Sequence, residues 1–193
     1  MRMFDSHNNE ITTMSIAIRN CPVKLPLTLL KPFIKNISFI AVHCSASSPK
    51  NPDIGVIEID KMHKQRGFAC IGYHYVIKRD GTIERGRPIN TQGAHIEGYN
   101  SVSLGICLIG GVDDKNRPVN NYTPEQFIAL KELILTLQQT RPFALVLGHR
   151  DFSPDKNHDG VISPNEYMKA CPCFDVREWM IKNHIPVQEQ KKP

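Results

Sequence analysis

Three side chains of metal-binding types occur at or near the ends of predicted strands. His43 directly follows the apolar stretch 39–42, His149 follows the stretch 145–148, and Cys171 lies further on in a Cys-Pro-Cys segment. A rigid sheet can present side chains to a cleft at the ends of its strands. Two imidazoles and a thiolate leave a fourth zinc position open to water, which is typical of catalytic rather than structural zinc sites. The spacing alone leaves open that these residue types are scattered by chance and that His43 only packs in the core.

The elements that must position these residues alternate between strand and helix. Residues 37–42 are apolar and β-branched, as in a buried strand, and Asp80-Gly81 between two such runs predicts a tight hairpin. Strands are predicted at residues 37–42, 73–77, 83–85, 103–109 and 145–148. Helices are predicted at about residues 51–67, 123–137 and 175–182. This alternation favours a single α/β domain with a mixed central β-sheet and flanking helices.

The predicted helix after Thr123 carries the clearest signals. Thr123 is a typical N-cap, Pro124 a typical first helical residue, and Gln126 completes a capping box. Four apolar residues then share one face of the helix: Phe127, Leu130, Ile134 and Leu137. This face predicts a helix packed against the sheet.

Length and composition limit the class of protein. The chain has 193 residues, of which 40% are hydrophobic and 22% charged, so it can bury a core and is neither disordered nor fibrous. A net charge of +5 suits an anionic polymer, such as a cell wall or a nucleic acid, without requiring one. No stretch of 18 apolar residues occurs, so we expect no membrane span.

The N-terminal region differs from the rest of the chain. Residues 1–36 carry prolines at 22, 26 and 32, which exclude a long helix, so we expect an accessory arm that packs in extended form across the domain. The first ten residues lack the apolar core of a signal peptide. Six cysteines without a paired framework favour a reducing compartment.

Several ordered motifs resemble one family closely. The motifs are Val42-His43-Cys44-Ser45-Ala46, the run from Gly72 to Gly81, Gly93-Ala94-His95, Gly98-Tyr99-Asn100, the run from Gly105 to Gly111, and Lys169-Ala170-Cys171-Pro172. Together they resemble the type 2 N-acetylmuramoyl-L-alanine amidases, phage-lysozyme-like zinc enzymes related to peptidoglycan recognition proteins. The resemblance covers about residues 37–182 and implies an amidase domain of that fold, with a tail at 183–193.

The resemblance also implies roles for individual residues. It makes His43, His149 and Cys171 the ligands of a Zn²⁺ cofactor, with Tyr73 and Lys169 as catalytic residues. The implied reaction is hydrolysis of the amide between N-acetylmuramic acid and L-alanine of peptidoglycan. A tyrosine hydroxyl and a lysine ammonium are suitable donors for the oxyanion that forms in this reaction. Cys173 is a conceivable second thiolate, because in an extended segment it would share a face with Cys171, but the family pattern uses only the first of these two cysteines.

Three further residues match family positions that line the substrate groove. His63, His95 and Asn100 are therefore expected to bind substrate, although a buried, hydrogen-bonded role for either histidine stays open. These assignments depend on the resemblance and not on spacing.

An insertion between His149 and Cys171 matches a calcium-binding pattern. Residues 155–166 fit the EF-hand loop at positions 1, 3, 5, 6 and 12. The candidate Ca²⁺ ligands are Asp155, Asn157, Asp159, the Val161 carbonyl and Glu166. Pro154 precludes a long helix before the loop, so we interpret it as a structural calcium loop inserted in an enzyme, the alternative being a polar insertion that binds nothing.

Together these inferences predict an endolysin-like zinc amidase that lyses cell walls. The alternatives are a non-catalytic peptidoglycan-binding module and a calcium sensor. The module is disfavoured because Cys171 is present, and the sensor because one isolated loop is too small a part of the chain. We expect a monomer that acts on muropeptides without nucleic acid and stays cytoplasmic until it is released to the cell wall.

Overall fold

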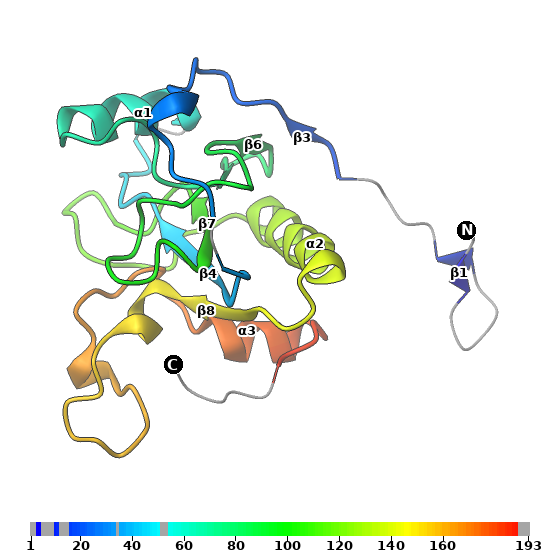
Figure 1. Cartoon of the computed structure of the whole chain (residues 1–193). Helices are drawn as coiled ribbons and strands as arrows, with labels where there is room; N and C mark the ends of the chain where they lie inside the picture. Colours follow the sequence, from blue (N-terminus) through cyan, green and yellow to red (C-terminus); the bar gives the residue numbers. More distant parts are fainter. Residues whose placement is uncertain (1–2, 5–9, 12–15, 34, 51–53, 189–193) are drawn as a thin grey trace.

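The computed structural model describes residues 3–4, 10–11, 16–33, 35–50 and 54–188 (Figure 1). Its strands are β1 (Met3–Phe4), β2 (Glu10–Ile11), β3 (Ile18–Arg19), β4 (Phe39–Cys44), β5 (Tyr75–Ile77), β6 (Ile83–Arg85), β7 (Ser103–Leu108) and β8 (Leu145–Gly148). Its α-helices are α1 (Val56–Gln65), α2 (Pro124–Thr140) and α3 (Val176–Lys182). Three short 3-10 helices complete the elements: η1 (Leu27–Leu29), η2 (His149–Phe152) and η3 (Pro164–Glu166). None of the described helices is long and apolar enough to cross a membrane.

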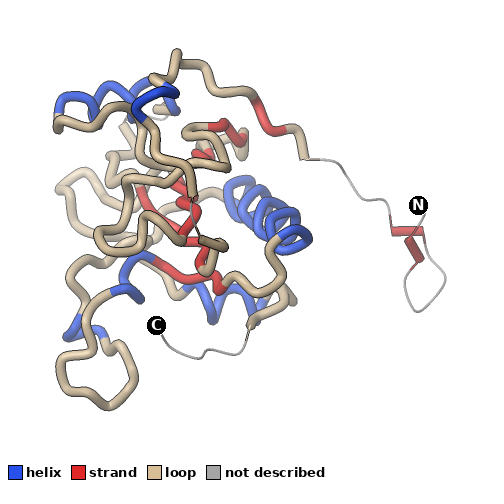
Figure 2. Tube along the Cα trace, in the orientation of Figure 1, coloured by secondary structure: helices blue, strands red, loops and turns tan. Residues whose placement is uncertain are grey.

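Six strands form one mixed sheet in the order β3-β6-β5-β7-β4-β8. β5 and β6 pair antiparallel around the predicted Asp80-Gly81 hairpin, and all other neighbouring strands in this sheet pair parallel. Helices α1 and α2 separate groups of strands along the chain, and the tube in Figure 2 shows the helices outside the central strands. The predicted α/β fold with a mixed sheet and flanking helices is confirmed.

The two faces of the sheet are covered by different helices. On one face, Leu130 and Ile134 of α2 and Met180 of α3 pack with Val42 and Ile106 in the largest apolar cluster. On the other face, α1 packs its own apolar residues against neighbours in β5 and β7. Because side chains alternate along a strand, His43 points to the opposite face from Val42 and lies on the α1 side.

The predicted helices and strands occur close to their expected bounds. In α2 the Thr123 hydroxyl accepts the Gln126 backbone N–H at 3.2 Å, as the capping box requires. Asp175 caps α3 in the same way, through the Glu178 N–H at 2.7 Å. The expected start of the first helix at residues 51–53 lies outside the described residues, and α1 is assigned from Val56.

Part of the N-terminal arm packs on the domain. β3 adds a parallel edge strand beside β6, and Cys21, Val23 and Leu25 pack against the apolar cluster beneath α1. Phe33 stacks on His74, with ring centroids 6.0 Å apart. The arm thus contacts both the sheet edge and the polar interior of the domain, whereas its boundary at residue 36 stays a prediction.

His74 is a buried polar link between strands. Its backbone N–H donates to the Gly105 carbonyl, and the Gly105 N–H donates to His74 Nδ1 at 2.9 Å. The other ring nitrogen, Nε2, donates to the Thr91 carbonyl at 2.9 Å. The ring is therefore satisfied only when it is neutral, and burial lowers the pKa of His74 to about 4.

This pKa predicts a pH-dependent loss of stability. Because the unfolded histidine binds a proton near pH 6.5 and the folded one near 4, the unfolded state is favoured as pH falls through this interval. Between pH 7 and pH 5, His74 should cost the metal-free protein about 2 kcal/mol of unfolding free energy. His74→Asn keeps an acceptor for Gly105 without titrating, so its denaturant-measured stability should fall by that much less. Equal falls in the parent and the variant would contradict this role.

Candidate metal centre

His43 and His149 meet because their strands are parallel neighbours. β4 and β8 pair with Val42 opposite Gly148, so the next residue of β4, His43, and the first residue after β8, His149, lie side by side at the carboxyl ends of these strands. The Nδ1 atoms of His43 and His149 lie 3.1 Å apart. Two imidazole nitrogens therefore point at one small volume above the carboxyl end of β4 and β8.

Cys171 enters this volume from the turn before α3. The Arg150 backbone N–H donates to the Cys171 carbonyl at 2.8 Å, and the Cys44 N–H donates to Cys171 Sγ at 3.1 Å. The ligand atoms of His43, His149 and Cys171 all lie within 4.8 Å of one another. In the described part of the chain, this is the only group of three or more His, Cys, Asp or Glu side chains so close together.

The protonation of the cluster suits a divalent metal. Burial lowers the pKa of His43 far below its ordinary value and that of His149 to about 4, so both imidazoles are neutral and keep a lone pair. The hydrogen bond with Cys171 raises the pKa of Cys44 to about 12, so Cys44 stays a thiol. Two neutral histidines and one cysteine are a donor set that fits zinc.

A groove of about 540 Å³ lies over the cluster. Tyr73 and Lys169 line it together with His149 and Cys171. The Tyr73 ring centroid is 5.1 Å from that of His43, and burial raises the pKa of Tyr73 well above its usual range, so its hydroxyl remains a donor. Lys169 is exposed, and its charge contributes to lowering the pKa of His149. The structure thus brings both expected catalytic side chains into the groove.

The three expected substrate-binding residues also line this groove, but each has an internal partner. His63 is buried, and its Nδ1 accepts the Gly72 N–H at 2.9 Å. Asn100 Oδ1 accepts the N–H groups of His95 and Ile96, at 2.7 and 3.0 Å. Asn100 therefore fixes the loop that carries His95.

His95 contacts a member of the metal cluster directly. Its Nδ1 lies 3.0 Å from His43 Nε2, the ring nitrogen of His43 that faces away from His149. Sequence reasoning missed this contact, because the two histidines are 52 residues apart and nothing in their spacing links them. The Gly-Ala-His motif at 93–95 identified His95 as a candidate site residue but did not indicate that it contacts His43.

The extended segment expected at Cys171 and Cys173 does not occur, so the strand alternation on which that expectation depended is wrong. Residues 171–174 form a turn rather than an extended segment, and Cys173 has a positive φ of 73°. Its thiol donates to the Gly111 carbonyl at 3.1 Å. The chain reverses at Pro172, so the two side chains cannot be related by the alternation of a strand.

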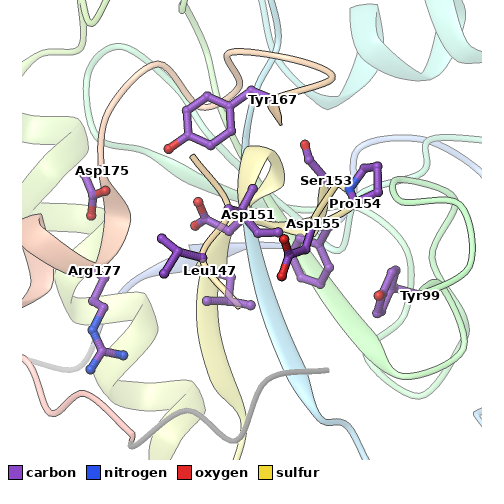
Figure 3. Close-up of a pocket in the computed structure, with 12 residues that line it drawn as sticks. Tyr99, Leu147, Asp151, Ser153, Pro154, Asp155, Tyr167, Asp175 and Arg177 are labelled. Atoms are coloured by element: carbon purple, nitrogen blue, oxygen red, sulfur yellow. The ribbon is translucent and has the colours of Figure 1, made fainter. Parts of the chain in front are cut away.

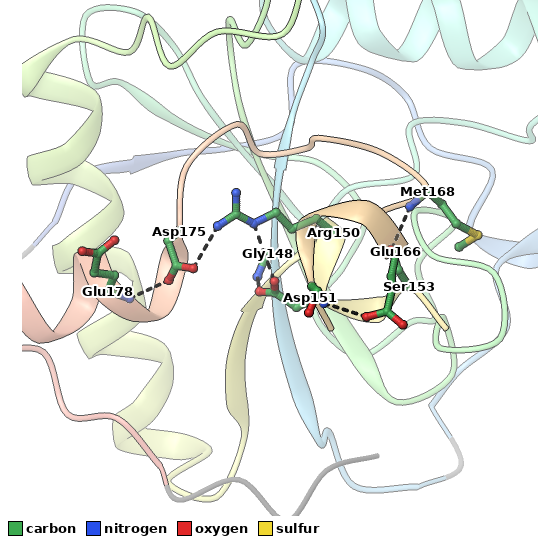
Figure 4. Close-up of polar contacts among 9 residues, drawn as sticks. Gly148, Arg150, Asp151, Ser153, Glu166, Met168, Asp175 and Glu178 are labelled. Atoms are coloured by element: carbon green, nitrogen blue, oxygen red, sulfur yellow. Dashed lines mark hydrogen bonds and ion pairs between the residues drawn. The ribbon is translucent and has the colours of Figure 1, made fainter. Parts of the chain in front are cut away.

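The segment between His149 and Cys171 is tied at its base. Arg150 donates to Asp175 at 2.9 Å and lies 3.7 Å from Asp151 (Figure 4). Its guanidinium also lies over the Tyr167 ring, 5.0 Å from the ring centroid. The Met168 N–H donates to Ser153 Oγ at 3.0 Å. These contacts join the end of β8, the Cys171 turn and the start of α3.

The expected calcium ligands are not gathered around one point. Glu166 is buried, and its carboxylate accepts backbone N–H groups of Lys156 and Ser163, both at 2.8 Å. Asp155 Oδ2 accepts the Gly160 N–H at 2.7 Å. Asp155 Oδ1 is buried and has no hydrogen-bond partner among the described residues. Asp155 lines a separate cavity of about 500 Å³ beside β8, shown in Figure 3.

Comparison with known proteins gives one consistent family. The model of the N-acetylmuramoyl-L-alanine amidase family matches residues 34–173. An endolysin of Enterobacteria phage K11 is 43% identical over 139 residues, which are 72% of this chain and 82% of the endolysin. The N-acetylmuramoyl-L-alanine amidase LysC from Clostridium intestinale is 26% identical, with a TM-score of 0.68 over 89% of this chain and all of LysC. Bumblebee PGRP-SA shares the fold, with 20% identity and a TM-score of 0.66 over 86% of this chain and 95% of that protein.

The geometry of the cluster predicts opposite behaviour for its two neighbouring cysteines. Cys171→Ser should abolish zinc retention, because a neutral hydroxyl is a far poorer ligand than a thiolate. Cys173→Ser should keep zinc, because its side chain contacts Gly111 and a serine hydroxyl can make the same bond. Metal analysis of both purified variants after dialysis is the measurement. Stoichiometric zinc in Cys171→Ser would remove Cys171 from the ligand set.

Proposed function

The chain belongs to the N-acetylmuramoyl-L-alanine amidase family, and from this premise we propose that its catalytic metal is zinc, held by His43, His149 and Cys171. The enzyme hydrolyses the amide between N-acetylmuramic acid and L-alanine of peptidoglycan, as its endolysin and amidase relatives indicate. The observation that carries the zinc proposal is the convergence of three ligand atoms within 4.8 Å at the floor of a groove. When bound, zinc supplies activation of water and polarisation of the scissile carbonyl.

Tyr73 and Lys169 are proposed to act on the oxygen of the scissile amide. As the carbonyl carbon becomes tetrahedral, its oxygen gains negative charge, which a hydroxyl and an ammonium can stabilise by donating hydrogen bonds. Tyr73 suits this role because burial keeps it protonated, and Lys169 because it lines the same groove as Cys171. Lys169 is also a candidate donor of the proton that the leaving amine needs.

His63 and Asn100 are proposed to hold the muropeptide. His63 uses Nδ1 internally, which leaves Nε2 as its protonated nitrogen. Asn100 uses only Oδ1 in the loop, so its amide N–H₂ is the group proposed to reach substrate. A monomeric enzyme, cytoplasmic until it is released to the cell wall, would complete this endolysin-like function. Membership of an enzyme family makes the non-catalytic binding module the weaker alternative.

Digestion of purified sacculi tests the proposed function. We expect free stem peptides that begin with L-alanine, identified by mass spectrometry, with the glycan strands left uncut. A zinc chelator should stop the release, and added zinc should restore it. Release that persists in chelator-treated protein free of metal would contradict zinc dependence, whereas bound but intact sacculi would contradict hydrolysis.

Lys169→Ala tests the role of the Lys169 ammonium independently of zinc binding in the same assay. The variant should keep stoichiometric zinc and lose about 10²–10³-fold in turnover, the usual effect of removing one oxyanion donor. Lys182→Ala is the matched control, since Lys182 is exposed on α3 and pairs only with Glu178 among the described residues. Equal turnover of both lysine variants would exclude Lys169 from the mechanism.

We further propose that the 155–166 loop binds Ca²⁺. Support comes from the EF-hand spacing and from the buried Asp155 Oδ1, which has no hydrogen-bond partner in the described part of the chain. Hydrogen bonds from the backbone N–H groups of Ser163, Lys156 and Asn157, that of Ser163 having the largest effect, lower the pKa of Glu166. Its carboxylate is therefore ionised. Binding requires Glu166 to leave these donors and to join Asp155, Asn157, Asp159 and the Val161 carbonyl around the ion.

Calcium should therefore order the loop and stabilise the adjacent ligand turn. We expect a rise in the melting temperature and in activity at millimolar Ca²⁺. Asp155→Asn combined with Glu166→Gln keeps the shape of both side chains but removes two charges, so it should lose both effects while retaining zinc. Asp114→Ala, in a different exposed loop, is the control. If calorimetry detects no binding at millimolar Ca²⁺, the calcium proposal is wrong and the loop is a polar insertion that binds no ion.

A further inference from the structure

His95 contacts the side of the His43 ring that faces away from His149. His43 Nδ1 faces His149 Nδ1 at 3.1 Å, and His43 Nε2 faces His95 Nδ1 at 3.0 Å. A metal shared with His149 must therefore use His43 Nδ1. The proton of neutral His43 is then on Nε2, and it is donated to the lone pair of His95 Nδ1.

The fold leaves space for the His95 ring at two glycines. A Cβ at Gly105 would lie 2.8 Å from His95 Cγ and 3.0 Å from Nδ1. A Cβ at Gly93 would lie 2.6 Å from His95 Nε2. Side chains at either position would displace the ring, so both strand β7 and the preceding loop are shaped around it.

A hydrogen bond and a ring contact hold His95 in place. Asn100 accepts the His95 backbone N–H, which holds the loop, and His74 packs edge-on with ring centroids 5.8 Å from those of His95. His95 Nε2 is buried and has no hydrogen-bond partner among the described residues. One ring nitrogen of His95 is thus occupied by His43 and the other is enclosed, so neither is placed to bind substrate.

We propose that His95 is a positioning residue that fixes the tautomer and the ring orientation of His43, an inference that rests on the zinc site proposed above. By accepting the Nε2 proton, His95 keeps His43 Nδ1 free for the metal and aimed at His149. An outer partner of a metal-ligating histidine also makes that ligand more basic, and losing such a partner typically weakens metal binding about 10–100-fold.

Two substitutions separate this role from packing. His95→Leu fills a similar volume but offers no acceptor, whereas His95→Asn places an amide oxygen close to the position of Nδ1. We expect chelator competition to show zinc binding weakened about 10–100-fold in His95→Leu and within about threefold of the parent in His95→Asn. The visible spectrum of the Co²⁺ form should change in His95→Leu and be retained in His95→Asn.

The control is another groove histidine. His63→Leu removes a buried ring that accepts from the Gly72 N–H and packs against Phe68 and Tyr73. In the described part of the chain it makes no hydrogen bond to His43 or His149, so the zinc affinity of the variant should match that of the parent. Unfolding free energies of the metal-free forms complete the comparison. We expect His95→Leu to be less stable than His95→Asn without metal, because both variants lose His95 Nε2 but only His95→Leu leaves the buried His43 Nε2–H without an acceptor.

The outcomes distinguish this inference from the function on which it rests. Zinc affinity of His95→Leu equal to the parent would overturn the positioning role alone. Equal losses in His95→Leu and His95→Asn, matched by equal losses of metal-free stability, would also overturn it, since packing would then suffice. If the parent binds no zinc, or His43→Ala binds it as tightly as the parent, the zinc site itself fails and the inference fails with it.

Discussion

The parallel pairing of β4 with β8 is the constraint on which the centre depends. With Val42 opposite Gly148, the two strands deliver His43 and His149 to the same edge, and no flexible segment separates either histidine from the sheet. A shift of one residue in this register would turn His43 toward the α2 face, because strand side chains alternate. The ladder that builds the core therefore also sets the distance between the two imidazoles.

Burial gives these imidazoles the charge state that a metal ligand needs. In the low-dielectric interior, desolvation is the largest cause of the lowered pKa of His43, His149 and His95. Three charged imidazoles this close together would repel one another, whereas a neutral ring can donate a hydrogen bond to the next ring. The same burial raises the pKa of Tyr73, whose hydroxyl is a hydrogen-bond donor at neutral pH.

Local signals in the sequence were sufficient for most of the fold, whereas the members of the cluster were predicted from the resemblance to a known family. The capping box at Thr123 and the Asp80-Gly81 hairpin both depend on neighbours within a few residues, and both were predicted correctly. The partners of His95 and Asn100 are tertiary, so no local pattern could reveal them. The Cys171–Cys173 error has the opposite origin: alternation was assumed across Pro172, where the chain turns.

Cys171 is the one of the three proposed ligands that neither belongs to a strand nor directly follows one, and its position depends on contacts at the base of an insertion. Loop-closure entropy grows only slowly with length, so residues inserted after Pro154 are tolerated if the two ends remain joined. Here the ends are joined by Ser153 with Met168 and by Arg150 with the Cys171 carbonyl. Because these bonds lie between the insertion and the cluster, the conformation of the loop can affect Cys171 only through them. A ligand bound in the loop would act on the centre by stabilising this base rather than by entering the site.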